Sequence, residues 1–197
     1  MFDPISIEAI FIVFFYYCKK DFRIMANLGL VSKIFLFLAI LFFALFLGSY
    51  VTRSMIVYQL FEADGQSYKS LYTNQNMIAV LPTIMPAIIL HLVSYGMFLI
   101  SSLIFILTSK IKIKYEGWLF AIILIIIVTA PFEIYLDTID LKIVPMIMSD
   151  PIDVSPVLGL IKERMNVLSS FSLIEIFSFA AVIFLFLFKP LRKKYEN

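Results

Sequence analysis

Four ionisable side chains interrupt stretches of the sequence that are otherwise long and apolar. They are Arg53, His91, Glu133 and Glu175. Measured from the predicted cytoplasmic end of each helix at about 1.5 Å per residue, they lie at depths of about 28, 25, 22 and 20 Å. Two carboxylates, an imidazole and a guanidinium at similar depth could exchange protons, bind a cation or anchor a polar head group. We therefore treat these residues as a candidate intramembrane polar cluster.

The same four residues also fit a structural role. A lone charge at membrane depth costs about 2.5 to 3.5 kcal/mol, so these groups should face the bundle interior and find one another or water. We expect Arg53 to pair with Glu175 or Glu133, and His91 to bridge them. In the structural interpretation such pairs fix helix packing, while Glu133 and Arg53 reach the outer surface along their apolar stems. Glu175 lies deepest inside its predicted span, that is, farthest from the outer membrane surface, and it is the strongest functional candidate.

The apolar stretches predict an all-α polytopic transmembrane helical bundle, with a single membrane domain over residues 1–197. About 20 apolar residues cross a hydrocarbon core of roughly 30 Å. Four stretches reach that length and are predicted as secure spans: residues 34–53, 81–108, 117–136 and 168–188. The shorter stretch 4–18 predicts a fifth, N-terminal span, or else a re-entrant or surface-lying segment.

Prolines and polar residues predict the interruptions between these spans. Pro82 and Pro86 predict a break or kink in the first turns of the 81–108 helix. The segment from Asp137 to Val167 contains three prolines and is predicted to be the longest connector, divided into short pieces.

Charge partition predicts the orientation of the bundle. Eleven of the 16 basic residues but only three of the 14 acidic ones fall in three segments: 19–33, 110–116 and the tail from Lys189. Basic connectors stay on the cytoplasmic side. We therefore expect an integral protein of the bacterial inner (plasma) membrane with a cytoplasmic C-terminus. Its basic tail, which would either face anionic lipid or only stop transfer, contains Lys189, Arg192, Lys193 and Lys194.

Composition excludes several classes of protein. The chain is 62% apolar and 15% charged, whereas soluble domains are about a quarter charged. One cysteine and one histidine rule out an internal disulfide, a cysteine metal cluster and a histidine-rich metal site, although a carboxylate site stays open. No phosphate loop, metal-ligand spacing or catalytic motif is present. We expect no cofactor, no metal site, no nucleic-acid partner and no enzymatic activity.

Two segments resemble a known family. The run KIKIKYEGWLFAIILIIIVTAP from Lys110 to Pro131 resembles the basic turn, span and proline of Yip1-domain integral membrane proteins. The Leu158-Gly159-Leu160 step and the run LSSFSLIEIFSF from Leu168 to Phe179 resemble the next segment of that family. The match covers the C-terminal two fifths of the chain. It implies a helical, non-enzymatic membrane protein that acts by association with other proteins.

Two functions follow as expectations. The first is an accessory or assembly subunit of a membrane complex, such as a transport or export complex, whose partners are other integral membrane subunits and the lipid bilayer. The alternative is an ion-coupled permease or a channel component that uses an outer-leaflet cluster of Glu175, Glu133 and His91. The sequence identifies no small-molecule substrate.

Overall fold

The computed structural model describes residues 28–62, 67–167 and 171–191. Over these ranges the protein is all-helical, as predicted, and its only β pairing is an isolated bridge between Phe61 and Tyr68. The elements are α2 (Leu30–Leu60), α3 (Asn74–Thr108), the 3-10 turn η1 (Ile113–Tyr115), α4 (Gly117–Ile147), α5 (Val154–Val167) and α6 (Phe171–Phe188). The predicted N-terminal span 4–18 lies outside the described residues.

Three of these helices are long and apolar enough to cross a membrane, namely α2, α3 and α4. Each runs for 31 residues or more, and most side chains along their apolar stretches are at least partly exposed on the surface of the single chain. Exposed leucine, isoleucine and phenylalanine are suited to lipid rather than to water. The chain thus has the helical make-up of an integral membrane protein, with α6 as a shorter apolar helix.

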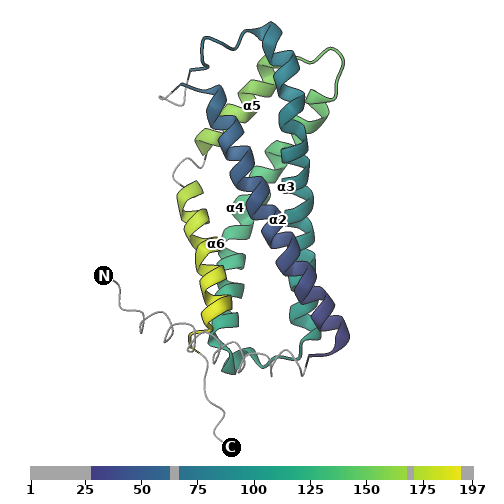
Figure 1. Ribbon diagram of the computed structural model, residues 1–197, viewed down its shortest axis with the longest axis vertical. Helices are drawn as coiled ribbons and strands as arrows, with labels where there is room; N and C mark the ends of the chain where they lie inside the picture. The colour runs from purple at the N-terminus through teal and green to yellow at the C-terminus, as the bar shows by residue number, and fades with distance from the viewer. Residues whose placement is uncertain (1–27, 63–66, 168–170, 192–197) are drawn as a thin grey trace, which may run out of the picture.

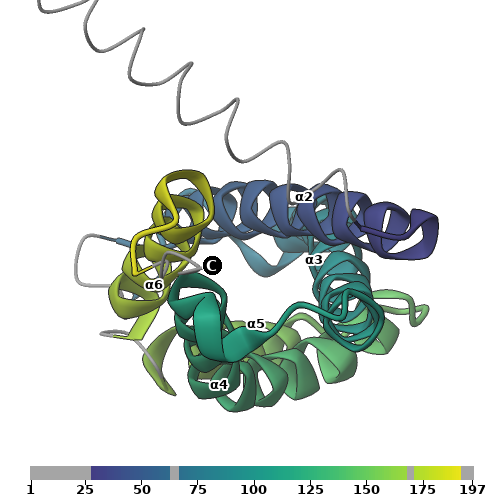
Figure 2. The ribbon, with the colours of Figure 1, turned by 90° about the horizontal axis from the view of Figure 1, so that it is seen from below.

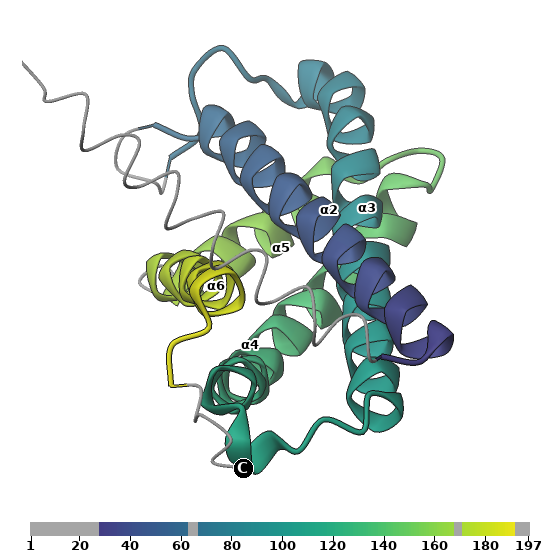
Figure 3. The ribbon, with the colours of Figure 1, turned by 60° about the horizontal axis from the view of Figure 1, so that its bottom comes forward.

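The five helices form an elongated bundle (Figure 1). The α2 helix packs mainly against α3, and α4 packs against α6. Viewed along the bundle, α2 and α4 lie on opposite sides, with α3 and α6 between them (Figure 2). The α5 helix passes obliquely behind α2 and leads the chain back toward α6 (Figure 3). We refer to the two ends of the bundle as the α5 end and the η1 end.

The connection between α2 and α3 is fastened to α5. The Tyr68 hydroxyl donates a hydrogen bond of 3.2 Å to the Leu158 carbonyl. Partial burial raises the pKa of this hydroxyl, because the phenolate would lose its hydration, so the group remains a donor at neutral pH. Thr73 caps α3 by accepting a 3.3 Å hydrogen bond from the Asn76 backbone N–H.

Of the break or kink predicted at Pro82 and Pro86, the break does not occur, and the kink stays a prediction. Helix α3 is continuous from Asn74 to Thr108 with both prolines inside it. A proline lacks the N–H that a helix interior needs, but membrane helices accommodate it where neighbouring helices and hydroxyl side chains satisfy nearby carbonyl groups.

The predicted connector from Asp137 to Val167 is mostly helical, which corrects that part of the sequence analysis. Helix α4 continues to Ile147, and α5 fills residues 154–167. The helix extends past Asp137 and Asp140 because both carboxylates are turned into the bundle, where Asp140 meets two guanidinium groups. Ile139, Ile143 and Ile147 continue the same buried face.

Three apolar clusters fill the interior along the bundle. At the α5 end, Val57, Leu81, Ile88, Ile143 and Val157 belong to a cluster made by α2, α3, α4 and α5. A layer of aromatic rings follows, and we call it the aromatic layer: Phe46, Tyr50, Tyr95, Phe98 and Phe179. The third cluster lies at the η1 end around Trp118 and Phe105.

Candidate functional site

Every one of the five described α-helices contributes an ionisable side chain to one buried region. These side chains form what we call the polar cluster: Arg53 from α2, His91 from α3, Glu133, Asp137 and Asp140 from α4, Arg164 from α5 and Glu175 from α6. His91, Glu133, Asp140 and Glu175 are completely buried. Charged residues at this depth rarely occur without partners or a function.

The spacing along α4 explains how one helix supplies three carboxylates. Glu133, Asp137 and Asp140 are separated by four and then three residues. Residues at these intervals lie on the same face of an α-helix, one turn apart. The buried face of α4 therefore presents three acidic groups, about one turn apart, to the bundle interior.

Asp140 is the one of these three carboxylates that is fully paired with guanidinium groups. Both nitrogens of the Arg53 fork donate to its two oxygens. Arg164 Nε donates to Asp140 Oδ2 at 3.1 Å. A planar guanidinium matches a carboxylate in this two-bond geometry, and such charge-assisted hydrogen bonds are among the strongest in proteins. The arrangement joins α2, α4 and α5 around one carboxylate.

His91 lies between the other two carboxylates of α4 without bonding to them. Its Nε2 atom is 3.7 Å from Glu133 Oε2 and 3.7 Å from Asp137 Oδ1. Both separations exceed an ordinary hydrogen bond. The imidazole ring rests on the aromatic layer, with ring centroids 5.0 Å from Phe46 and 5.9 Å from Tyr50. The ring is thus fixed on one face while both of its nitrogens lack a hydrogen-bond partner among the described residues.

Glu175 enters from α6 beside Glu133 and Tyr50. Its side chain is fully buried, and neither carboxyl oxygen has a hydrogen-bond partner within the described part of the chain. Arg164 Nη2 is also without one, 3.9 Å from Glu133 Oε2.

The polar cluster is therefore split into a satisfied half and an unsatisfied half. Asp140 and its two arginines form the first half. In the second half, eight buried atoms lack a hydrogen-bond partner among the described residues: both ring nitrogens of His91, both oxygens of Glu133 and of Glu175, Asp137 Oδ1 and Arg164 Nη2. Native proteins leave few buried polar atoms unpaired, and a bound water or ion commonly accounts for a group of them.

The balance of charges also shows that the groups of the polar cluster do not fully satisfy one another. The cluster has two guanidinium groups against four carboxylates, which leaves an excess of two negative charges when His91 is neutral. Uncompensated charge in a low-dielectric interior is strongly unfavourable. The arrangement is suited to a cation, or to protons on two of its groups.

The surroundings restrict access to the polar cluster. The aromatic layer lies on its η1 side and the largest apolar cluster on its α5 side. Asp137 and Arg164 are the two members with appreciable exposure, at 15% and 14% of the side chain. They mark the edge through which water or an ion would reach the buried groups.

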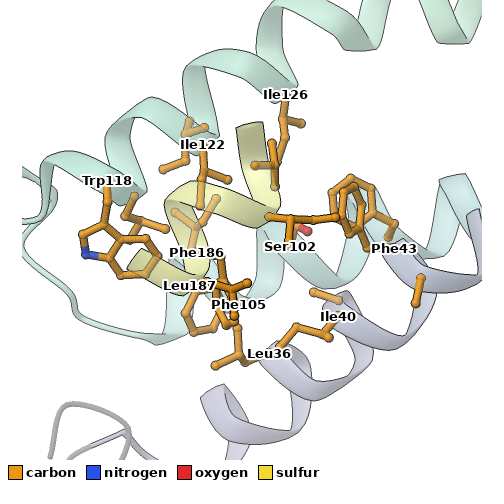
Figure 4. A pocket seen from close by; sticks show the side chains of 18 of the residues that line it. Leu36, Ile40, Phe43, Ser102, Phe105, Trp118, Ile122, Ile126, Phe186 and Leu187 are labelled. Atoms are coloured by element: carbon orange, nitrogen blue, oxygen red, sulfur yellow. The ribbon is translucent and has the colours of Figure 1, made fainter. Parts of the chain in front are cut away.

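Beyond the aromatic layer, toward the η1 end, lies an apolar cavity of about 360 Å³. Its walls come from α2, α3, α4 and α6, and Ser102 is among its few polar residues (Figure 4). Its lining offers water almost no hydrogen-bonding groups. The cavity and the aromatic layer together separate the polar cluster from the η1 end.

The structure places all four residues of the predicted cluster in this region. The predicted partner of Arg53 was wrong, because Arg53 binds Asp140 rather than Glu175 or Glu133. His91 does lie between two carboxylates, Glu133 and Asp137. In the predicted basic tail, Lys189 lies over the Trp118 ring, with its nitrogen 5.4 Å from the ring centroid. Arg192, Lys193 and Lys194 lie outside the described residues.

The sequence analysis missed Asp137, Asp140 and Arg164. A signal for the first two was present, since Glu133, Asp137 and Asp140 repeat with the four- and three-residue spacing of one helix face. Nothing comparable marks Arg164, which lies on a separate helix and reaches Asp140 only in the folded bundle.

Comparisons with known proteins add no assignment: no family model, no curated protein and no solved structure matches this chain. The resemblance to Yip1-domain proteins stays a prediction.

Proposed function

We propose that this chain is a membrane protein that binds and conducts a cation through the polar cluster, either as an ion-coupled permease or as a channel component. The observation that supports this most is the excess of buried carboxylates over guanidinium groups, together with the unpaired atoms of His91, Glu133 and Glu175. A cluster that served packing alone would gain from pairing these groups, as it does for Asp140.

In this proposal the polar cluster is a site with one open edge. An ion enters past Asp137 and Arg164, the exposed members. It is held beside Glu133 and Glu175, and the aromatic layer blocks its further passage toward the η1 end. Hydrophobic constrictions gate ion pathways by excluding water. Conduction then requires Phe46, Phe98 and Phe179 to move apart.

The proposed topology completes this scheme. We propose that residues 168–188, which include α6, form a fourth span, and that the C-terminus faces the cytoplasm of a bacterial inner membrane. The basic segment 110–116, which includes η1 and carries three lysines, would then be cytoplasmic as well. The open edge of the polar cluster would face the outside.

Flux measured in liposomes tests the proposal. The full chain is reconstituted, and the uptake of protons and of monovalent and divalent cations is followed with enclosed fluorescent indicators. Glu175→Gln removes one buried charge with almost no change in shape, and we expect it to reduce the flux at least tenfold. Glu163→Gln is the matched control, because Glu163 is exposed on α5, and it should leave the flux unchanged. Equal flux through both variants would refute the proposal.

The short connectors favour a second candidate, an accessory or assembly subunit of a membrane complex. Between the described helices the connecting segments are short: residues 61–73, 109–116, 148–153 and 168–170. These lengths cannot form a separate recognition domain, so within the described part of the chain partners would bind along the helices. Co-purification of another membrane protein in a fixed ratio, with no flux by the isolated chain, would favour this candidate over the first.

A further inference from the structure

We infer that His91, Glu133 and Asp137 form a binding site for a divalent transition-metal ion of the Zn²⁺ type. The inference rests on the proposed function, since it names the class of cation that the polar cluster holds. The sequence analysis expected no metal site, because the chain has one cysteine and one histidine and shows no metal-ligand spacing. The third ligand, Asp137, lies in the segment that was predicted to be a connector.

The three side chains have the separations that a metal ion needs. One ligand atom from each lies within 4.8 Å of the other two, and His91 Nε2 is 3.7 Å from each carboxylate. A tetrahedral ion with bonds of about 2.1 Å holds its ligand atoms about 3.4 Å apart. Small side-chain rotations therefore bring imidazole and carboxylates onto one ion.

The ligand atoms are also free to bind. Neither ring nitrogen of His91 nor either oxygen of Glu133 has a hydrogen-bond partner among the described residues, and the same holds for Asp137 Oδ1. These atoms are too far apart for hydrogen bonds with each other yet close enough to share an ion.

A separate residue supports the same conclusion. Glu175 belongs to another helix, is fully buried, and directs its unpaired carboxyl against Glu133. It can accept a hydrogen bond from a metal-bound water. Such neighbours of the ligands raise metal affinity.

Charge and ligand type define the ion. A divalent cation cancels the two excess negative charges of the polar cluster, a count that already includes the positive charges of Arg53 and Arg164. Imidazole together with carboxylates suits zinc, iron and related ions. Calcium and magnesium prefer oxygen ligands alone and higher coordination numbers.

Metal titration of the purified chain tests the inference. The full chain carries a histidine-free affinity tag, is stripped with a chelator, and is titrated with Zn²⁺ and with Co²⁺. We expect one ion per chain and, for Co²⁺, the intense visible bands of four- or five-coordinate geometry. Glu133→Gln and Asp137→Asn should each weaken binding at least tenfold, whereas Glu163→Gln should not change it.

The outcomes separate the inference from the proposed function. Absence of stoichiometric binding by the unaltered chain, or unchanged affinity in both ligand variants, would overturn the inference. If the Glu133 variant fails to fold, the partly exposed Asp137 variant and the Co²⁺ spectrum of the unaltered chain still decide the question. Metal binding without flux would contradict the proposed transport alone, while flux lost in Glu175→Gln without metal binding would contradict only the metal site.

Discussion

Asp140 and Glu175 are both buried carboxylates of the polar cluster, but their surroundings differ. Asp140 accepts hydrogen bonds from Arg53 and Arg164, whereas the oxygens of Glu175 have none among the described residues. At the scale of single residues, the contacts of Asp140 indicate a structural role, whereas Glu175 is the residue that we propose serves the ion site.

Replacing Asp140 by Asn should destabilise the protein. The change leaves two guanidinium groups without their counter-charge in a buried region, and removing one partner of a buried ion pair costs about 3 to 5 kcal/mol. Thermal unfolding in detergent measures this effect. Asp153→Asn, at an exposed position before α5, is the control and should unfold like the unaltered chain. An Asp140 variant that is equally stable would contradict the assigned role.

At the scale of elements, the sequence located the helices better than it located their ends. Arg53, His91, Glu133 and Glu175 could be placed at one depth because the rise per residue of a helix is constant. The end of α4 could not be found this way. Asp137 and Asp140 look like the start of a polar connector until the arginines that neutralise Asp140 are known, and these lie 87 and 24 residues away.

The two prolines of α3 are a second case in which contacts between distant residues decide where a helix continues. Pro82 and Pro86 weaken a helix locally, which predicts a break or kink. The packing of α3 against α2 along the bundle and the burial of Leu81, Ile84 and Ile88 favour a continuous helix. Long-range packing therefore overrides a local preference, and a single sequence contains little information about it.

At the scale of the whole molecule, the layers follow one another along the bundle. The apolar cluster at the α5 end, the polar cluster, the aromatic layer and the apolar cavity lie in that order. Among the described members of the polar cluster, Asp137 and Arg164 have the largest exposed fractions, so the cluster is most open at this edge. In the proposed function, the side of the membrane that this edge faces decides the direction from which an ion is taken up.

Cysteine labelling tests the proposed orientation. In a Cys18→Ser background, which lacks cysteine, Ser149→Cys and Lys112→Cys place single thiols at exposed positions on the two ends of α4. We expect a membrane-impermeant maleimide to label Ser149→Cys in intact cells and Lys112→Cys only after permeabilisation, because basic turns stay cytoplasmic. The reverse pattern would invert the proposed topology.

The melting temperature of Glu175→Gln in metal-free detergent solution tests the central claim most directly. If Glu175 is an unpaired charge retained for an ion, the neutral amide removes a buried-charge penalty of about 2.5 to 3.5 kcal/mol in part. For a chain of this size each kcal/mol recovered raises the melting temperature by about 2 to 4 °C. We predict a rise of at least about 2 °C relative to both the unaltered chain and Glu163→Gln. A fall in melting temperature would mean that Glu175 is a structural partner, and would contradict the assignment of the polar cluster as an ion site.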